Sequence, residues 1–231
     1  MTRVLMVVSS RDHLAESAQP TGAWLEELAA PYYVFADSGC EVTIASPRGG
    51  KAPLDPLSLE APWLTSNGER FQRDRDAVTK LEHSVPLASI DRGDVDALYC
   101  VGGAAAAWDF PDDAHLAALV ARLHGTGRPV AGVCHGVLGL TGARKADGQP
   151  IVAGCAVTGV SNAEEVMTGF DRIVPVMPEN RLRELGGRYS CAAPFAEYVA
   201  VDGHLLTGQN PASAAPLAQR LLTRLRESPP A

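Results

Sequence analysis

Short apolar, β-branched runs alternate along this chain with longer amphipathic segments, and this alternation restricts the fold more than any other feature of the sequence. Strands that helices cover on both faces of a sheet have this continuous apolar character. The pattern therefore predicts an α/β fold: a doubly wound, mostly parallel sheet with helices on both faces. The expected strands are residues 3–9, 41–46, 95–101, 129–133, 156–160, 198–201 and 204–207.

The segments between these strands predict the helices and one hairpin. Asp202-Gly203 separates the last two strands by a two-residue turn, so we expect an antiparallel pair at an edge of the sheet. Pro31 is expected to kink or break the first helix, because proline cannot donate a helical hydrogen bond. The expected helices are residues 22–38, 69–83, 112–125, a short one from 135, 163–168, 178–185 and 211–226.

Length and charge narrow the classes of function. The chain has 231 residues, 20 Lys+Arg and 27 Asp+Glu, so its net charge is 20 − 27 = −7 at pH 7. An acidic chain without basic clusters is not expected to bind nucleic acid or an anionic membrane. Its apolar runs are too short for a membrane span or a signal peptide. We expect one domain over 1–231, with a cap or lid insertion at about 52–83.

The cysteines argue against a disulfide framework and a metal site. Their number is odd, they are widely spaced, and none forms a Cys-x-x-Cys pair or lies near a pair of histidines. We therefore expect a cytoplasmic protein without a metal ion. Four of the five, namely Cys40, Cys100, Cys155 and Cys191, are expected to be packing residues.

The fifth cysteine has the sequence context of a nucleophile. Cys134 follows a buried strand within Gly-x-Cys-x-Gly, from Gly132 to Gly136, and precedes a predicted helix. This is the cysteine form of the strained strand-to-helix turn that carries nucleophiles, where larger neighbours would clash with the backbone. A thiol at a helix N-terminus gains from the helix dipole, so we expect a lowered pKa.

The surroundings of such a thiol can also be predicted from the sequence. His135 is the obvious base, and its backbone N–H is one donor for an oxyanion. The turn Gly102-Gly103 follows another apolar strand and is expected to supply a second donor at Gly103, because ligands bind at the carboxyl ends of parallel strands. Trp24, Gly102 and Trp108 are expected to line the substrate site.

Several motifs together resemble the ThiJ/PfpI superfamily. They are TGAWLEEL (21–28), VTIASPRGG (42–50), GG (102–103), WDFPD (108–112), VCHG (133–136), VTGVSNAEE (157–165) and TGQNPAS (207–213). This superfamily contains the Parkinson-linked deglycase and has the flavodoxin-like fold of class I glutamine amidotransferases. The chain is most similar to the branch of glyoxalase III and heat-inducible chaperone/deglycase proteins.

The resemblance implies a role for each matching residue. Cys134 is the implied nucleophile, His135 the base, and Glu165 the acid that orients the imidazole, with Glu164 as the alternative if the register shifts by one residue. Glu26 is implied to contact the thiol. The resemblance also implies a homodimer and a reaction without a cofactor.

One position departs from the pattern of the branch. The Gly-Gly pair is usually followed there by His-Gly, whereas this chain continues with Ala104-Ala105. The backbone donor at Gly103 is compatible with the change. A polar imidazole is absent, however, so we expect Ala104 to make the substrate pocket more apolar.

These observations favour addition of a thiolate to an electrophilic carbon of a small molecule. The first candidate is a glutathione-independent glyoxalase, which converts a 2-oxoaldehyde such as methylglyoxal to a 2-hydroxy acid, or the related protein deglycase. The second is a hydratase or lyase for a more apolar substrate, such as an isocyanide or a secondary metabolite. A non-catalytic chaperone or an oxidation sensor is the third.

Two further activities of the superfamily fit the sequence less well. A glutamine amidotransferase would add a His-x-Glu pair downstream of its cysteine, but His204 is the only later histidine and Leu205-Leu206 follow it. A PfpI-type peptidase forms its site between subunits, and one sequence does not show that assembly.

Overall fold

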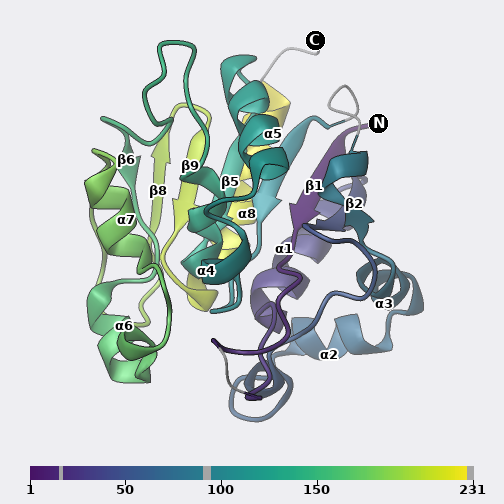
Figure 1. Ribbon diagram of the computed structural model, residues 1–231. Helices are drawn as coiled ribbons and strands as arrows, with labels where there is room; N and C mark the ends of the chain where they lie inside the picture. Colours follow the sequence, from purple (N-terminus) through teal and green to yellow (C-terminus); the bar gives the residue numbers. More distant parts are fainter. Residues whose placement is uncertain (16–17, 91–94, 228–231) are drawn as a thin grey trace.

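The computed structural model describes residues 1–15, 18–90 and 95–227, and in this part of the chain a seven-stranded sheet forms the centre (Figure 1). All neighbouring strands are parallel except the last pair. The doubly wound, mostly parallel sheet is therefore confirmed. The strand order is β3 (Val85–Pro86), β2 (Glu41–Ser46), β1 (Arg3–Val7), β4 (Ala97–Cys100), β5 (Val130–Val133), β9 (Leu205–Gly208) and β8 (Val199–Asp202).

The path of the chain through this sheet fixes where a ligand can bind. It starts in the middle at β1, builds outward to β3, and then returns to β4 on the other side of β1. The direction of building reverses between β1 and β4, and the crevice outside the carboxyl ends of such strands is the usual ligand site. The predicted hairpin is confirmed, because β8 pairs antiparallel with β9 at the edge of the sheet.

Helices cover both faces of the sheet, as expected (Figure 1). Successive residues of β1 alternate between two apolar clusters: Met6 packs with the first, and Leu5 with the second. The first cluster contains side chains from α1 (Leu25–Ala36), α3 (Arg75–Glu82) and α8 (Ala214–Glu227). The second contains side chains from α4 (Ala106–Asp109), α5 (Ala114–Gly125) and the 3₁₀ helix η3 (Cys134–Leu140).

Contrary to the prediction, residues 156–160 do not form a strand of the central sheet. Only β6 (Ala156–Val157) is a strand, and it pairs with β7 (Arg188–Tyr189) in a separate two-stranded sheet. These two strands and β3 have two residues each, too short for a recognisable alternation. The helices α6 (Asn162–Thr168) and α7 (Pro178–Glu184) occupy the chain between β6 and β7.

Two helix predictions are corrected by the structure. Helix α1 runs through Pro31, so the break expected there as one of two outcomes does not occur. The single helix expected at 69–83 is two helices, α2 (Ser66–Arg73) and α3, which meet at Asp74. The Asp74 side chain accepts hydrogen bonds from the backbone N–H groups of Asp76 and Ala77, so it caps α3 and ends α2.

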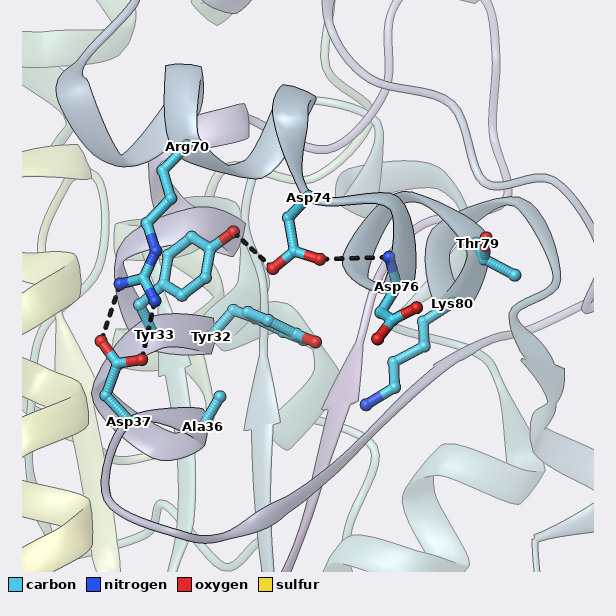
Figure 2. A pocket seen from close by; sticks show the side chains of 9 residues that line it. All are labelled: Tyr32, Tyr33, Ala36, Asp37, Arg70, Asp74, Asp76, Thr79 and Lys80. Atoms are coloured by element: carbon cyan, nitrogen blue, oxygen red, sulfur yellow. Dashed lines mark hydrogen bonds and ion pairs between the residues drawn. The ribbon is translucent and has the colours of Figure 1, made fainter.

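A polar cluster joins these two helices to α1 (Figure 2). Arg70 forms two hydrogen bonds to Asp37, at 2.7 and 2.8 Å, and its guanidinium carbon lies 3.6 Å from the ring centroid of Tyr33. The hydroxyl of Tyr33 donates to Asp74. These contacts hold the 52–83 segment, which also contains the 3₁₀ helix η1 (Pro56–Leu59), against α1. The other 3₁₀ helices are η2 (Leu87–Ser89), η4 (Phe170–Arg172) and η5 (Pro211–Ser213).

Candidate active site

Cys134 occupies a sharp turn at the carboxyl end of β5. Its φ of 54° lies in the left-handed region, which is unusual for a residue other than glycine. A Cβ at Gly136 would lie 2.4 Å from the carbonyl oxygen of Cys100, and one at Gly132 would lie 2.9 Å from Cα of Val137. Only glycine fits at both positions, so the Gly-x-Cys-x-Gly pattern reflects the close packing of β4, β5 and η3.

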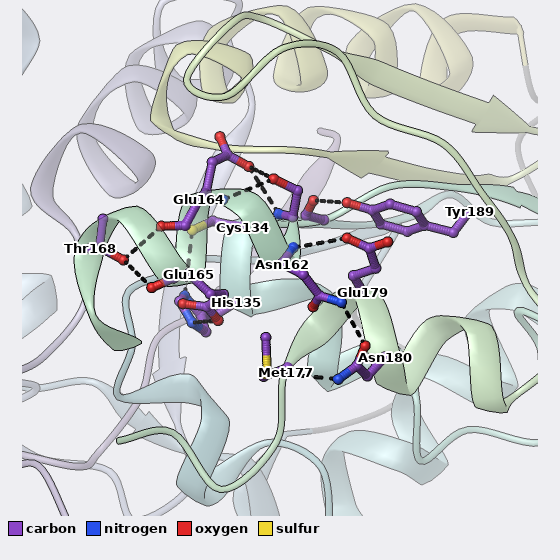
Figure 3. Close-up of polar contacts among 12 residues, drawn as sticks. Cys134, His135, Asn162, Glu164, Glu165, Thr168, Met177, Glu179, Asn180 and Tyr189 are labelled. Atoms are coloured by element: carbon purple, nitrogen blue, oxygen red, sulfur yellow. Dashed lines mark hydrogen bonds and ion pairs between the residues drawn. The ribbon is translucent and has the colours of Figure 1, made fainter. Parts of the chain in front are cut away.

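Three side chains form a chain of polar contacts that begins at this cysteine (Figure 3). Sγ of Cys134 lies 3.5 Å from Nδ1 of His135, and Nε2 of His135 lies 2.8 Å from Oε1 of Glu165. All three residues are buried. This arrangement can fix the imidazole tautomer, with N–H toward the carboxylate and the free nitrogen toward sulfur. The structure thus brings together the three residues predicted to be the nucleophile, the base and the acid that orients the base.

The neighbouring Glu164 belongs to a different network. One of its oxygens accepts from the backbone N–H and hydroxyl of Ser161 and from Gln209, and the other accepts from the N–H of Phe195 and from Asn210. With Ser161 it forms a capping box at the start of α6. Glu165, and not the alternative Glu164, therefore reaches His135.

The expected contact between Glu26 and the thiol is wrong by one residue. The fully buried carboxyl of Glu27 faces Cys134, whereas Glu26 accepts hydrogen bonds from Thr65 and Asn67. Glu26 precedes the exposed Asp37 by eleven positions, about three helical turns, so both lie on the outer side of α1. This spacing is the sequence signal that could have separated Glu26 from Glu27.

Gly102 provides the space that Glu27 occupies. A Cβ at Gly102 would lie 2.1 Å from Oε2 of Glu27 and 2.9 Å from Cβ of Cys134, so a side chain at this position would exclude either the carboxyl or the cysteine. Neither oxygen of Glu27 has a hydrogen-bond partner of ordinary geometry in the described part of the chain. A buried carboxyl without full hydrogen bonding destabilises its charged form.

The electrostatics of the site follow from this burial. Burial raises the pKa of Glu27 to about 8, although the Cys134 thiol and the Gly102 N–H partly oppose the shift. Burial also raises the pKa of Cys134 well above its ordinary value; the carboxyl groups of Glu27 and Glu165 add to this, and the N–H of His135 opposes it. The expected lowering of the thiol pKa is therefore wrong. Burial next to two carboxyl groups destabilises the thiolate more than the N–H of His135, at the start of η3, stabilises it.

The remaining predicted site residues lie around this cluster. Gly103 follows Gly102 in the turn beside Cys134, and Ala104 is buried in the second apolar cluster. Trp24 is the N-cap residue of α1, and its ring packs edge-on against Trp63. Trp108 lies in α4, half-buried, with the guanidinium of Arg11 5.9 Å from its ring centroid. Trp24 and Trp108 are thus on different elements at the carboxyl edge of the sheet.

Two other features are absent from the described residues. Residues 1–15, 18–90 and 95–227 contain no cluster of three or more His, Cys, Asp or Glu side chains placed to hold a metal ion. Across the same ranges, no helix combines the length and the apolar character needed to span a bilayer. All five cysteines are free thiols; Cys40 and Cys100 are buried, Cys155 is half-buried and Cys191 is exposed.

Comparisons with known proteins extend over nearly the whole chain. The model of the DJ-1/PfpI family matches residues 20–224. Glutathione-independent glyoxalase HSP31 of Saccharomyces cerevisiae is 28% identical over 234 residues, which cover 96% of this chain and 97% of that protein. The crystal structure of Rapid Encystment Protein 24 KDa of Francisella tularensis is 34% identical with a TM-score of 0.93, covering 97% of this chain and 99% of that one.

A third comparison concerns the fold alone. The structure of glyoxalase III from Candida albicans is 21% identical and covers 96% of this chain and 97% of that chain, with a TM-score of 0.86. The strand order, the turn at Cys134 and the extent of the match to the family model agree with one another. The chain therefore belongs to the DJ-1/PfpI family.

Proposed function

We propose that this protein is a glutathione-independent glyoxalase that converts a small 2-oxoaldehyde such as methylglyoxal to a 2-hydroxy acid. The observation that carries the proposal is the series of contacts between the buried side chains of Cys134, His135 and Glu165. The carboxyl of Glu27 faces the same thiol. The similarity to glutathione-independent glyoxalase HSP31 supports the same activity. A glyoxalase of this kind uses no glutathione because the enzyme supplies the thiol itself.

The first chemical step is addition of Cys134 to the aldehyde carbon. His135, oriented by Glu165, accepts the thiol proton at Nδ1 as the sulfur–carbon bond forms. The carbonyl π-electrons move to oxygen, and the backbone N–H groups of Gly103 and His135 are the proposed donors to that oxyanion. His135 then returns this proton to the oxygen, so the product is a neutral hemithioacetal on Cys134.

Proton transfers and one hydrolysis complete the reaction. A base removes the proton from the former aldehyde carbon to give an enediolate, and a proton returns to the neighbouring carbon. The hydroxyl proton of the first carbon passes to the oxygen of the second, so a thioester of the 2-hydroxy acid forms without external oxidant. Glu27 is suited to exchange protons here because its pKa of about 8 keeps it protonated at neutral pH. Water then cleaves the thioester, which releases the acid and restores the thiol.

The test is lactate formation from methylglyoxal without glutathione. We expect lactate from the wild type and from Cys191→Ser, whose cysteine is exposed and outside the site, but none from Cys134→Ser. Equal rates for Cys134→Ser and wild type would contradict the proposal. A folded wild type without lactate formation would also contradict it.

A second candidate activity is favoured by the alanine run after Gly103. Ala104, Ala105, Ala106 and Ala107 are all buried and apolar next to the turn beside Cys134. In this second activity the same thiol would add to an apolar electrophile, such as an isocyanide or a secondary metabolite. Cys134-dependent turnover of such a compound without lactate formation would select this candidate. A chaperone would protect a client protein equally well with Cys134→Ser, and an oxidation sensor would consume one equivalent of peroxide without turnover.

We also propose that the protein is a cytoplasmic homodimer. Free thiols throughout the chain fit a reducing compartment. The side chains of Val166 and Met167 on α6 are 64% and 65% exposed, which leaves an apolar surface for a second copy. Light scattering of the purified protein tests the dimer, and a monomer mass would contradict it.

We also propose that residues 52–83 act as a cap over the site.

A further inference from the structure

A small pocket lies beside the cysteine site and has no part in the proposed reaction. Its volume is about 230 Å³, and the residues that line it include Trp24, Pro62, Trp63 and Pro211 together with Glu26. Ligand pockets for larger compounds have volumes of about 300–1,000 Å³. A pocket of this size accepts a side-chain-sized group.

The carboxylate in this pocket is held in place but not neutralised. Thr65 donates to one oxygen of Glu26, and Nδ2 of Asn67 donates to the other at 3.2 Å. Both donors are uncharged. Among residues 1–15, 18–90 and 95–227, no Lys, Arg or His nitrogen lies within ion-pair distance of Glu26. Glu26 lies half-buried in the first turn of α1, where the helix dipole stabilises negative charge.

Two indole rings form a corner next to this charge. The ring centroids of Trp24 and Trp63 are 5.8 Å apart and their planes meet at 74°. Trp63 is 50% exposed, which is unusual for so large an apolar side chain. Indole faces attract cations through their quadrupole, most strongly where water is excluded.

A ligand of this pocket could be neutral and apolar, anionic or cationic, and the residues that line the pocket exclude the first two classes. A neutral apolar ligand would remove water from the Glu26 carboxylate without replacing its hydrogen bonds, and an anion would be repelled by it. A cation on a short alkyl chain satisfies the carboxylate and the two indole rings at once. We propose that Trp24, Trp63 and Glu26 form a binding site for an organic cation, an alkylammonium or alkylguanidinium group.

The location of the pocket connects it to the cysteine site without making it part of that site. The backbone N–H of Trp24 donates to the carbonyl oxygen of Gly102 at 3.0 Å, and Gly102 touches Glu27 and Cys134. An occupied pocket would therefore lie next to the turn that carries the proposed oxyanion donors. The inference goes beyond the proposed function and does not depend on it.

Intrinsic fluorescence offers a direct test, because two of the three tryptophans line the pocket. We expect n-butylguanidinium to change the emission saturably, whereas n-butylurea, its neutral isostere, leaves it unchanged. Glu26→Gln should weaken n-butylguanidinium binding by at least about tenfold, since it removes the charge and keeps an acceptor for Thr65. Glu60→Gln is the matched control, because Glu60 is an exposed carboxylate of the 52–83 segment and lies outside the pocket. Its binding should equal that of the wild type.

Two further variants and a peptide ligand complete the fluorescence test. Trp63→Leu should also weaken binding, and a thermal melt of each variant shows that it is folded. Binding to Cys134→Ser should match the wild type, which separates this inference from the glyoxalase proposal. Tighter binding of a capped arginine peptide than of n-butylguanidinium would assign the cation to a protein side chain, and the reverse to a free small molecule. Absence of saturable binding, or equal affinity for n-butylurea, would overturn the proposal.

Discussion

Two pairs of adjacent glutamates occupy the first turns of α1 and α6, and the members of each pair have opposite surroundings. Glu26 and Glu164 accept hydrogen bonds from neutral donors away from the cysteine. Glu27 and Glu165 are completely buried around Cys134 and His135, and each has at least one oxygen without a partner in the described residues. In both helices a single residue step separates a carboxyl that lies away from the cysteine from one that faces the cluster of Cys134 and His135.

The difference between Glu164 and Glu27 shows how hydrogen bonds decide the role of a buried carboxyl. Burial alone would raise the pKa of Glu164, but the donors of Ser161, Asn210 and Phe195 lower it below its ordinary value. Glu27 has only the Cys134 thiol and the Gly102 N–H to oppose its burial, and its pKa rises to about 8. Full hydrogen bonding makes a carboxylate a fixed anion of the fold, and its absence leaves a group that exchanges protons near neutral pH.

The largest expected effect is that of Glu165→Gln. An amide in place of the carboxylate loses control of the His135 tautomer and of the charge on the imidazolium, so we expect kcat to fall by about 10³-fold or more. The free energy of unfolding should change much less. Steady-state kinetics with methylglyoxal measure the effect, with Glu184→Gln, on the exposed side of α7, as the control. A loss smaller than tenfold would remove Glu165 from the proposed site.

Glu164→Ala should have the opposite profile, with its main effect on stability. It leaves the N–H of Phe195 and the amides of Gln209 and Asn210 without their acceptor, so we expect the free energy of unfolding to fall by about 3 kcal/mol or more. Urea denaturation measures this, against Glu184→Ala as the exposed control. If Glu164→Ala is as stable as the control, hydrogen bonding does not distinguish the two carboxyls.

Glu27→Gln should separate catalysis from thiol reactivity. Loss of the exchangeable proton should reduce kcat by about 10²-fold. The carboxylate of Glu27 raises the pKa of Cys134, so its removal should lower that pKa and speed alkylation by iodoacetamide above pH 8. Both rates falling together would instead show that Glu27→Gln only damages the site. Mass spectrometry of the labelled cysteines follows the alkylation.

The smallest expected effect is the pH dependence of stability. Glu27 has a raised pKa in the folded protein, so the folded state retains a proton that the unfolded state releases above its ordinary pKa of 4.5. The contribution of Glu27 to stability therefore decreases as the pH rises from 4.5 to about 8 and is constant beyond it. Relative to the wild type, Glu27→Gln should be about 2 kcal/mol more stable at pH 8 than at pH 6. Parallel stability curves would contradict the raised pKa.

The sequence predicts those features that depend on local pattern. Continuous apolar runs locate the central strands, because helices cover both faces of each strand, and the glycines around Cys134 reveal the turn. The hairpin at Asp202-Gly203 has a local signal of the same kind. Strands of two residues carry no such signal. The break at Asp74 depends on its capping of α3 and on its contact with Tyr33, which joins distant segments.

The site needs information that no single segment contains. Whether Glu26 or Glu27 faces the cysteine depends on the rotation of α1 about its axis, which packing against α8 and the sheet determines. The thiol pKa depends on how many carboxyl groups from α1 and α6 approach it and how completely water is excluded. Helix-dipole reasoning at Cys134 alone therefore gave the wrong direction.

The left-handed backbone at Cys134 has a consequence for how this position can evolve. A residue with a side chain at φ of 54° is strained, and glycine would relieve the strain. Glycine at this position would relieve the backbone strain but would also remove a side chain buried in the first apolar cluster. The proposed nucleophile is thus held in a strained turn, a trade-off usual for functional sites.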